Sequence, residues 1–139
     1  MAQKFQLTVN SDVNELGAVA EFVERAANAC GLNDDQLYDV QMAIDEAVTN
    51  VIEHAYHKSG GDIHIECAKR GNDFIVTIRD HGEQFDPKKV AQPKTRAGLS
   101  ERNIGGLGLF FMQKLMDKVE FEFSTERGNL LTMVKKIKK

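Results

Sequence analysis

Residues 33–57 carry apolar side chains at a regular helical spacing. The apolar positions follow one another at steps of three or four residues: Leu37, Val40, Ile44, Val48, Val51 and Ala55. At 100° per residue these six side chains fall within a narrow arc, so the pattern predicts a long helix that packs one face on a core. Asn33, with Gln36 three residues later, resembles a capping box and predicts where this helix begins. The pair Gly60-Gly61 ends the helical region.

Five other segments are expected to be strands. They cover residues 3–9, 62–70, 73–80, 119–125 and 129–136. The first three alternate apolar and polar side chains, which is the pattern of a strand with one buried face. Gly71 and Asn72 join the second and third segments into a hairpin, and a turn at Arg127-Gly128 separates the last two.

Two further helices complete the expected order of elements. One follows a cap at Ser11 or Asp12 and stops at Gly31, and the other covers about 106–118. The order is therefore strand, two helices, two strands, loop, helix and two strands. It predicts one domain over residues 1–139, an α/β (α+β) two-layer sandwich with helices on one face of a mostly antiparallel mixed sheet.

The loop before the third helix is unusually long. Residues 81–104 show no clear period and contain both prolines of the chain, with several basic side chains. Connections without secondary structure rarely exceed about 12–15 residues, so this loop is expected to be either disordered or functional.

Charge and composition exclude several classes of protein. Residues 1–70 hold 12 acidic and 5 basic side chains, whereas residues 71–139 hold 9 acidic and 13 basic ones. The acidic first half argues against a protein that coats nucleic acid, while the basic second half suits a small polyanion such as a nucleotide. No apolar run reaches the roughly 18–20 residues of a membrane span, and the N-terminus lacks a signal peptide. Cys30 and Cys67 fit neither a disulfide framework nor a zinc site, so we expect a cytoplasmic protein with reduced thiols.

The first candidate site lies on the helix of residues 33–57. Glu46 and Asn50 are four residues apart, which places a carboxylate and an amide on one stripe, roughly opposite the apolar arc. An amide oxygen is a suitable ligand for Mg²⁺, and a nearby carboxylate can orient or deprotonate an attacking hydroxyl. The alternative is a polar helix face that is simply solvated.

Two more candidates lie at the ends of elements. Asp80 ends an apolar strand, where its carboxylate can accept a hydrogen bond from an exocyclic amine, and Gly82 allows a close approach of the backbone. The glycines Gly105, Gly106 and Gly108 open the third helix and leave N–H groups free for phosphate. Each feature alone is also typical of an ordinary turn.

Taken in order, these segments resemble the GHKL superfamily of ATP-binding domains, which includes gyrase B, the Hsp90 chaperones, histidine kinases and MutL. Residues 45–50 and 54–56 look like the N box of that superfamily, and residues 80–87 look like its first glycine box. Residues 105–110 look like the second glycine box, and residues 128–132 resemble the closing strand. Within the superfamily, the chain is most similar to anti-sigma-factor serine/threonine kinases and related anti-sigma regulatory factors. The resemblance implies the Bergerat ATP-binding fold.

The resemblance also implies a role for each matching residue. Asn50 would bind the magnesium ion that bridges the ATP phosphates, and Glu46 would be the base that activates the acceptor hydroxyl. Asp80 would accept a hydrogen bond from the adenine amino group, assisted through water by Thr132. Gly82 would let the purine lie close to the backbone.

The phosphate end of the site is expected to follow the same family pattern. Residues 83–104 would form the ATP lid, and Gly105, Gly106 and Gly108 would give backbone contacts to the phosphates. Candidates for stabilising charge during phosphoryl transfer are Arg96 and Arg102.

The function expected from this resemblance is that of an anti-sigma-factor-type serine/threonine protein kinase. It would bind ATP and Mg²⁺, sequester a sigma factor, phosphorylate a STAS-domain antagonist of the anti-anti-sigma class, and act as a homodimer. A sensor histidine kinase is disfavoured, because no phosphoacceptor-histidine helix precedes the domain. The alternatives are an ATP-gated regulatory binding module without turnover and a structural α/β dimer that binds no nucleotide.

Overall fold

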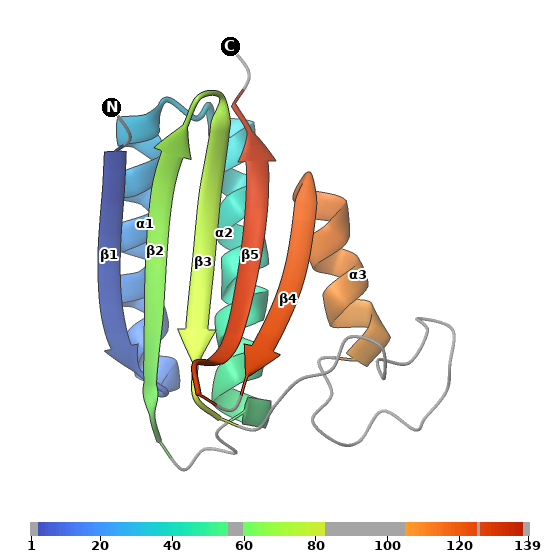
Figure 1. Cartoon of the computed structure of the whole chain (residues 1–139). Helices are drawn as coiled ribbons and strands as arrows, with labels where there is room; N and C mark the ends of the chain where they lie inside the picture. The colour runs from blue at the N-terminus through green and yellow to red at the C-terminus, as the bar shows by residue number, and fades with distance from the viewer. Residues whose placement is uncertain (1–2, 56–59, 83–104, 125, 138–139) are drawn as a thin grey trace.

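The computed structural model describes residues 3–55, 60–82, 105–124 and 126–137, which form two layers (Figure 1). Along the chain the elements are β1 (Gln3–Asn10), η1 (Val13–Glu15), α1 (Leu16–Cys30), α2 (Asp34–Asn50), η2 (Val51–Ala55), β2 (Asp62–Arg70), β3 (Asp73–Asp80), α3 (Gly105–Leu115), β4 (Lys118–Ser124) and β5 (Gly128–Lys136). The element η1 is a 3-10 turn and η2 is a π-helical turn. The predicted two-layer α+β class is confirmed.

The five strands form one sheet in the order β1-β2-β3-β5-β4. All four pairings within the described residues are antiparallel, which confirms the expected antiparallel character and corrects the expectation that the sheet is mixed. The helices cover one face of this sheet and the other face is open (Figure 1). Strand β3 lies at the centre, and its last residue, Asp80, is placed opposite Asn129 of β5.

Local sequence signals set most of the element boundaries. The predicted capping box is present, since Asn33 Oδ1 accepts from Gln36 N at 2.8 Å and Gln36 Oε1 accepts from Asn33 N at 2.9 Å. Helix α1 ends at Gly31, whose φ of 90° is in the left-handed region that glycine adopts without strain. Within the described ranges, no helix is long and apolar enough to cross a membrane.

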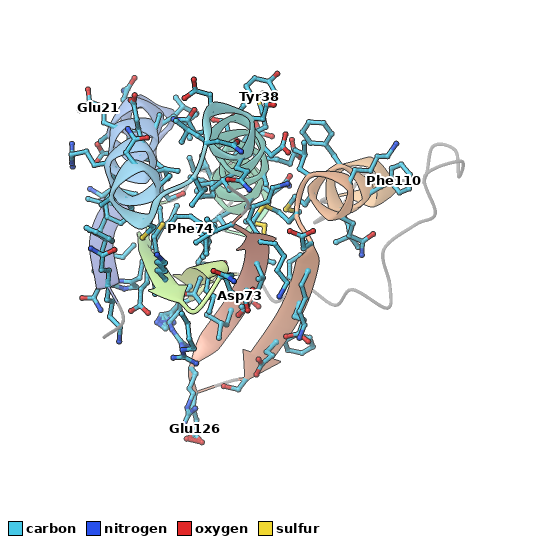
Figure 2. All side chains as sticks on the ribbon, turned by 90° about the horizontal axis from the view of Figure 1, so that it is seen from above. Glu21, Tyr38, Asp73, Phe74, Phe110 and Glu126 are labelled. Carbon is cyan, nitrogen blue, oxygen red and sulfur yellow. The ribbon has the colours of Figure 1, made fainter. Side chains whose placement is uncertain are left out.

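The hydrophobic core fills the space between the sheet and the helices. Fully buried side chains come from both layers, among them Ile44 of α2, Phe74 of β3 (Figure 2) and Met112 of α3. Both cysteines are free thiols in this core, as predicted. Burial raises the pKa of the Cys67 thiol to about 12, so this thiol stays protonated and unreactive near neutral pH.

Lys135 joins three elements at the end of the molecule where α3 finishes. Its Nζ lies 2.9 Å from Asp39 Oδ2 on α2 and donates at 2.6 Å to the carbonyl oxygen of Leu115, the last residue of α3. The side chain of Lys135 is only 14% exposed, so the ion pair is largely withdrawn from water. Removing the ammonium group leaves the carbonyl oxygen of Leu115 and the Asp39 carboxylate, which is 33% exposed, without this partner.

We therefore expect Lys135→Met to lower the free energy of unfolding by about 2 kcal/mol in urea titrations followed by circular dichroism. The matched control is Lys136→Met, the neighbouring lysine, whose ion pair with Asp73 is well exposed to solvent. This control is expected to change the urea midpoint very little. Equal midpoints for the two variants would show that the contacts of Lys135 carry no special weight.

Candidate functional site

The Glu46–Asn50 pair lies on α2 and forms a direct contact. Asn50 Nδ2 donates to Glu46 Oε2 at 3.0 Å, and the Asn50 side chain is only 5% exposed. Because Nδ2 of Asn50 is used in this hydrogen bond, the amide oxygen Oδ1 points away from Glu46. The pair thus presents a fixed amide oxygen beside a half-buried carboxylate.

The face of α2 that carries Asn50 is not solvated. The buried arc of this helix extends beyond the predicted apolar stripe to Ala43, Ala47 and Asn50. Helix α3 packs against α2. The alternative that this stripe is a plain solvated face is therefore wrong for Asn50.

The helix of residues 33–57 also ends differently from the prediction. Regular α-helical geometry stops at Asn50, and the chain continues as the π-helical turn η2. Such turns are rare and occur frequently at functional sites. Val51, the first residue of η2, is buried and lines a pocket between the sheet and the helices.

A partly enclosed pocket lies between the sheet and the helices α2 and α3. Its lining comes from both layers: Ala47, Val51, Ile78, Asp80, Met112, Phe121, Glu122, Asn129, Leu130 and Leu131. Most of these side chains are apolar, and polar groups gather where β3 ends. An apolar slot with a few fixed polar groups is the usual form of a site for a flat heterocycle.

Asp80 is the buried carboxylate of this pocket. It is 3% exposed, and its Oδ1 accepts from Gly82 N at 2.9 Å and from Asn129 Nδ2 at 2.8 Å. Among the described residues, no donor reaches its second oxygen, Oδ2. Asp80 therefore has one oxygen held in place by the protein and one that can accept a hydrogen bond from a ligand.

Asn129 is the site residue that the sequence analysis missed. It is 7% exposed and lies directly opposite Asp80 in the register of β3 and β5, so both side chains are on the helix-covered face. Thr132 lies opposite Thr77 on the open face of the sheet. The structure does not bring Thr132 to the pocket, and the predicted neighbour of Asp80 is corrected to Asn129. The alternation of the strand could have identified Asn129, because every second residue points to the same face and Asn129 therefore shares its face with the apolar Leu131 and Met133.

Gly128 fixes the position of this pair. Its φ is 83°, and a Cβ at this position would lie 2.3 Å from the carbonyl oxygen of Asp80 and 2.6 Å from Nδ1 of His81. Only glycine lets the turn before β5 approach the end of β3 so closely.

The glycine run expected to bind phosphate opens α3, which begins at Gly105. The first four N–H groups of a helix have no partner within it and favour anions. Figure 1 shows this end of α3 at the same end of the molecule as η2 and the end of β3. Gly106 and Gly108 lie in its first turn. The predicted lid 83–104, with Arg96 and Arg102, lies outside the described residues.

The described part of the site offers one side chain suited to binding Mg²⁺. Within the described residues, no group of three or more His, Cys, Asp or Glu side chains is placed to hold a metal ion. Mg²⁺ bound to a nucleotide, however, commonly takes only one or two protein ligands beside phosphate oxygens and water. The buried amide oxygen of Asn50 is of the required chemical type.

The chain is similar to known proteins along nearly its whole length. It is 30% identical over 137 residues to "Serine-protein kinase RsbW" of Halalkalibacterium halodurans, which covers 96% of this chain and 83% of that protein. It is 35% identical over 104 residues to "Anti-sigma F factor" of Thermoanaerobacter sp., covering 74% of this chain and 72% of that protein.

A solved structure shares the fold. The RsbU and RsbW domains of Rv1364c from Mycobacterium tuberculosis match 99% of this chain with a TM-score of 0.72 at 18% identity, and the chain spans 33% of that longer protein. The model of the family described as "Histidine kinase-like ATPase domain" matches residues 9–135. Because this match covers most of its length, the chain belongs to the histidine kinase-like ATPase domain family.

Proposed function

We propose that this chain is an anti-sigma-factor-type serine/threonine protein kinase that uses ATP and Mg²⁺. The observation that carries the proposal is the hydrogen bond between Glu46 and Asn50. Each of these residues directly precedes a residue of α2 or η2 that lines the pocket containing Asp80. The names of the relatives, a serine-protein kinase and anti-sigma F factors, support the same function.

In this proposal the adenine ring occupies the apolar pocket and its amino group donates to Oδ2 of Asp80. Asn129 and the backbone of Gly82 hold the other carboxylate oxygen, so the acceptor is already oriented before the nucleotide arrives. Orientation of this kind lowers the entropic cost of binding. Asn129 takes the place that the family resemblance gave to Thr132.

The phosphates would extend toward Asn50 and the N-terminus of α3. Asn50 Oδ1 would hold Mg²⁺, which supplies neutralising charge for the phosphate oxygens when bound. The first N–H groups of α3, in the turn that contains Gly105, Gly106 and Gly108, would donate to the same phosphates. Arg102 of the proposed lid is the further candidate for stabilising charge during transfer.

Glu46 would act as the base toward the acceptor hydroxyl. The hydroxyl oxygen of a Ser or Thr forms a bond to the γ-phosphorus, the bond from that phosphorus to the β-γ bridging oxygen breaks, and ADP leaves. The hydroxyl proton passes to the Glu46 carboxylate. The contact with Asn50 limits the positions that this carboxylate can take.

The proposed partners are a sigma factor and a STAS-domain antagonist. The chain would hold the sigma factor until the antagonist replaces it, and phosphorylation of the antagonist would weaken the second complex. Nucleotide state then shifts the balance between partners through a difference in affinity.

The test is incubation of the protein with γ-labelled ATP, Mg²⁺ and a purified STAS-domain protein from the same organism. Label on the STAS protein supports the kinase. Tight ATP binding without label supports a regulatory binding module that lacks turnover. Absence of ATP binding would contradict both the kinase and the regulatory binding module.

We also propose that the chain acts as a homodimer through the open face of its sheet. The middle of this face is half-buried: Ile75, Leu130 and Val134 flank the pair Thr77–Thr132, and side chains of both charges, such as Glu66 and Arg79, lie on the same face. Mixed charge on one face suits a two-fold, self-complementary contact. Sedimentation equilibrium is expected to give twice the mass of the chain, and a monomer at micromolar concentration would contradict this proposal.

A further inference from the structure

A second hollow lies on the helical layer, beside the proposed phosphate contact at Gly108. It is open, with about 670 Å³ including its mouth, and is lined by Glu46, Gly108, Phe110, Phe111 and Lys114. Glu46 comes from α2 and the other four residues come from α3. The proposed base therefore lies in the wall of this hollow together with Gly108, whose turn is proposed to contact the phosphates.

Two adjacent phenylalanines border this hollow without being needed for the core. Phe110 is 46% exposed and Phe111 is 38% exposed, whereas Met112, the next residue, is fully buried. Figure 2 places Phe110 on the side of α3 away from Phe74 in the core. Exposed aromatic side chains gathered at one hollow are typical of a surface that binds another protein.

Lys114 adds a positive charge to the same border. It lies one helical turn after Phe110, with Nζ 5.8 Å from the centroid of that ring. In the described part of the chain its ammonium group forms no ion pair. The contact with the ring covers only one side of the ammonium group, which stays accessible to water. The hollow thus combines apolar rings, one cation and the carboxylate of Glu46.

We propose that Phe110, Phe111 and Lys114 form the docking surface for the protein substrate whose hydroxyl is phosphorylated. The substrate places an aliphatic side chain between the two rings and an acidic side chain near Lys114, which brings its Ser or Thr to Glu46. The inference rests on the proposed function, because that function requires the acceptor hydroxyl to reach Glu46.

Other occupants fit the hollow less well. Residues 83–104 of this chain hold three acidic and five basic side chains, so their net charge has the same sign as Lys114. A second copy of the chain is expected at the open face of the sheet, on the layer opposite to α3. A substrate that carries an acidic group near its hydroxyl complements both Lys114 and the apolar rings.

The test compares steady-state phosphorylation of the STAS-domain protein by wild type, Phe110→Ala, Phe111→Ala and Lys114→Glu. For each variant we expect KM for the protein substrate to rise about 10-fold or more, with kcat and the Kd for ATP nearly unchanged. The matched control is Tyr38→Ala, which removes a 61% exposed aromatic from the outer side of α2 (Figure 2) and is expected to leave KM unchanged.

The outcomes separate this inference from the proposed function. Phosphorylation by wild type with unaltered KM in all three variants would overturn the docking surface alone. A fall in ATP affinity without a change in KM would assign the hollow to residues 83–104, and a loss of dimer would assign it to a second copy. If wild type transfers no label, binding of the STAS protein in the presence of a non-hydrolysable ATP analogue gives the same comparison without catalysis.

Discussion

Asp80→Asn is expected to weaken ATP binding about 100-fold while the fold is retained. The new amide oxygen still accepts from Gly82 N and Asn129 Nδ2, which now hold Oδ1 of Asp80. The amide nitrogen then takes the place of Oδ2 and presents a donor to the amino group of adenine. Two donors facing each other in a buried site leave both unpaired, and a mismatch of this kind costs about 2–3 kcal/mol.

Binding is measured by isothermal titration calorimetry with ATP and Mg²⁺, and with GTP in parallel. Since guanine presents an acceptor where adenine has its amino group, the substitution is expected to narrow the preference for ATP over GTP. The matched control is Asp73→Asn, the same substitution at the other end of β3, where the carboxylate pairs with Lys136 at the surface. Equal ATP affinity in the two variants would exclude Asp80 as the adenine acceptor.

The parts of the fold that depend on neighbouring residues were predictable from the sequence. The capping box of Asn33 and Gln36, the left-handed Gly31 and the turn at residues 71–72 all depend on contacts within a few residues. The burial of Asn50 was not predictable in this way. It depends on how α2 packs in the folded chain, where α2 contacts α3, a helix that begins only at Gly105, far along the sequence.

The error over Thr132 has a different physical origin. Successive side chains of a strand point to opposite faces, so an assignment that is off by an odd number of residues moves the side chain to the other face of the sheet. The family resemblance located the closing strand but did not fix which face Thr132 occupies. The face is set by the close contact of Gly128 with the backbone of Asp80, which brings Asn129 opposite that residue.

Glu46→Gln is expected to reduce the rate of phosphoryl transfer to the STAS-domain protein by about 10²–10⁴-fold, the usual contribution of a general base. Glutamine keeps an oxygen that accepts from Asn50 Nδ2, so the placement of Asn50 and the affinity for ATP are expected to change little. The expected fall in the transfer rate then comes from the loss of a basic, charged group and not from a change in packing. Single-turnover transfer with γ-labelled ATP measures it directly.

The matched control is Asp45→Asn, which removes the adjacent carboxylate of α2 on its exposed side. If both variants lose activity equally, the effect comes from the negative charge of the helix and not from a base at Glu46. If Glu46→Gln transfers label at the wild-type rate, positioning and electrostatic stabilisation carry the reaction without a base. A selective loss in Glu46→Gln with unchanged ATP binding places proton transfer at this carboxylate, because the substitution leaves its hydrogen bond to Asn50 in place.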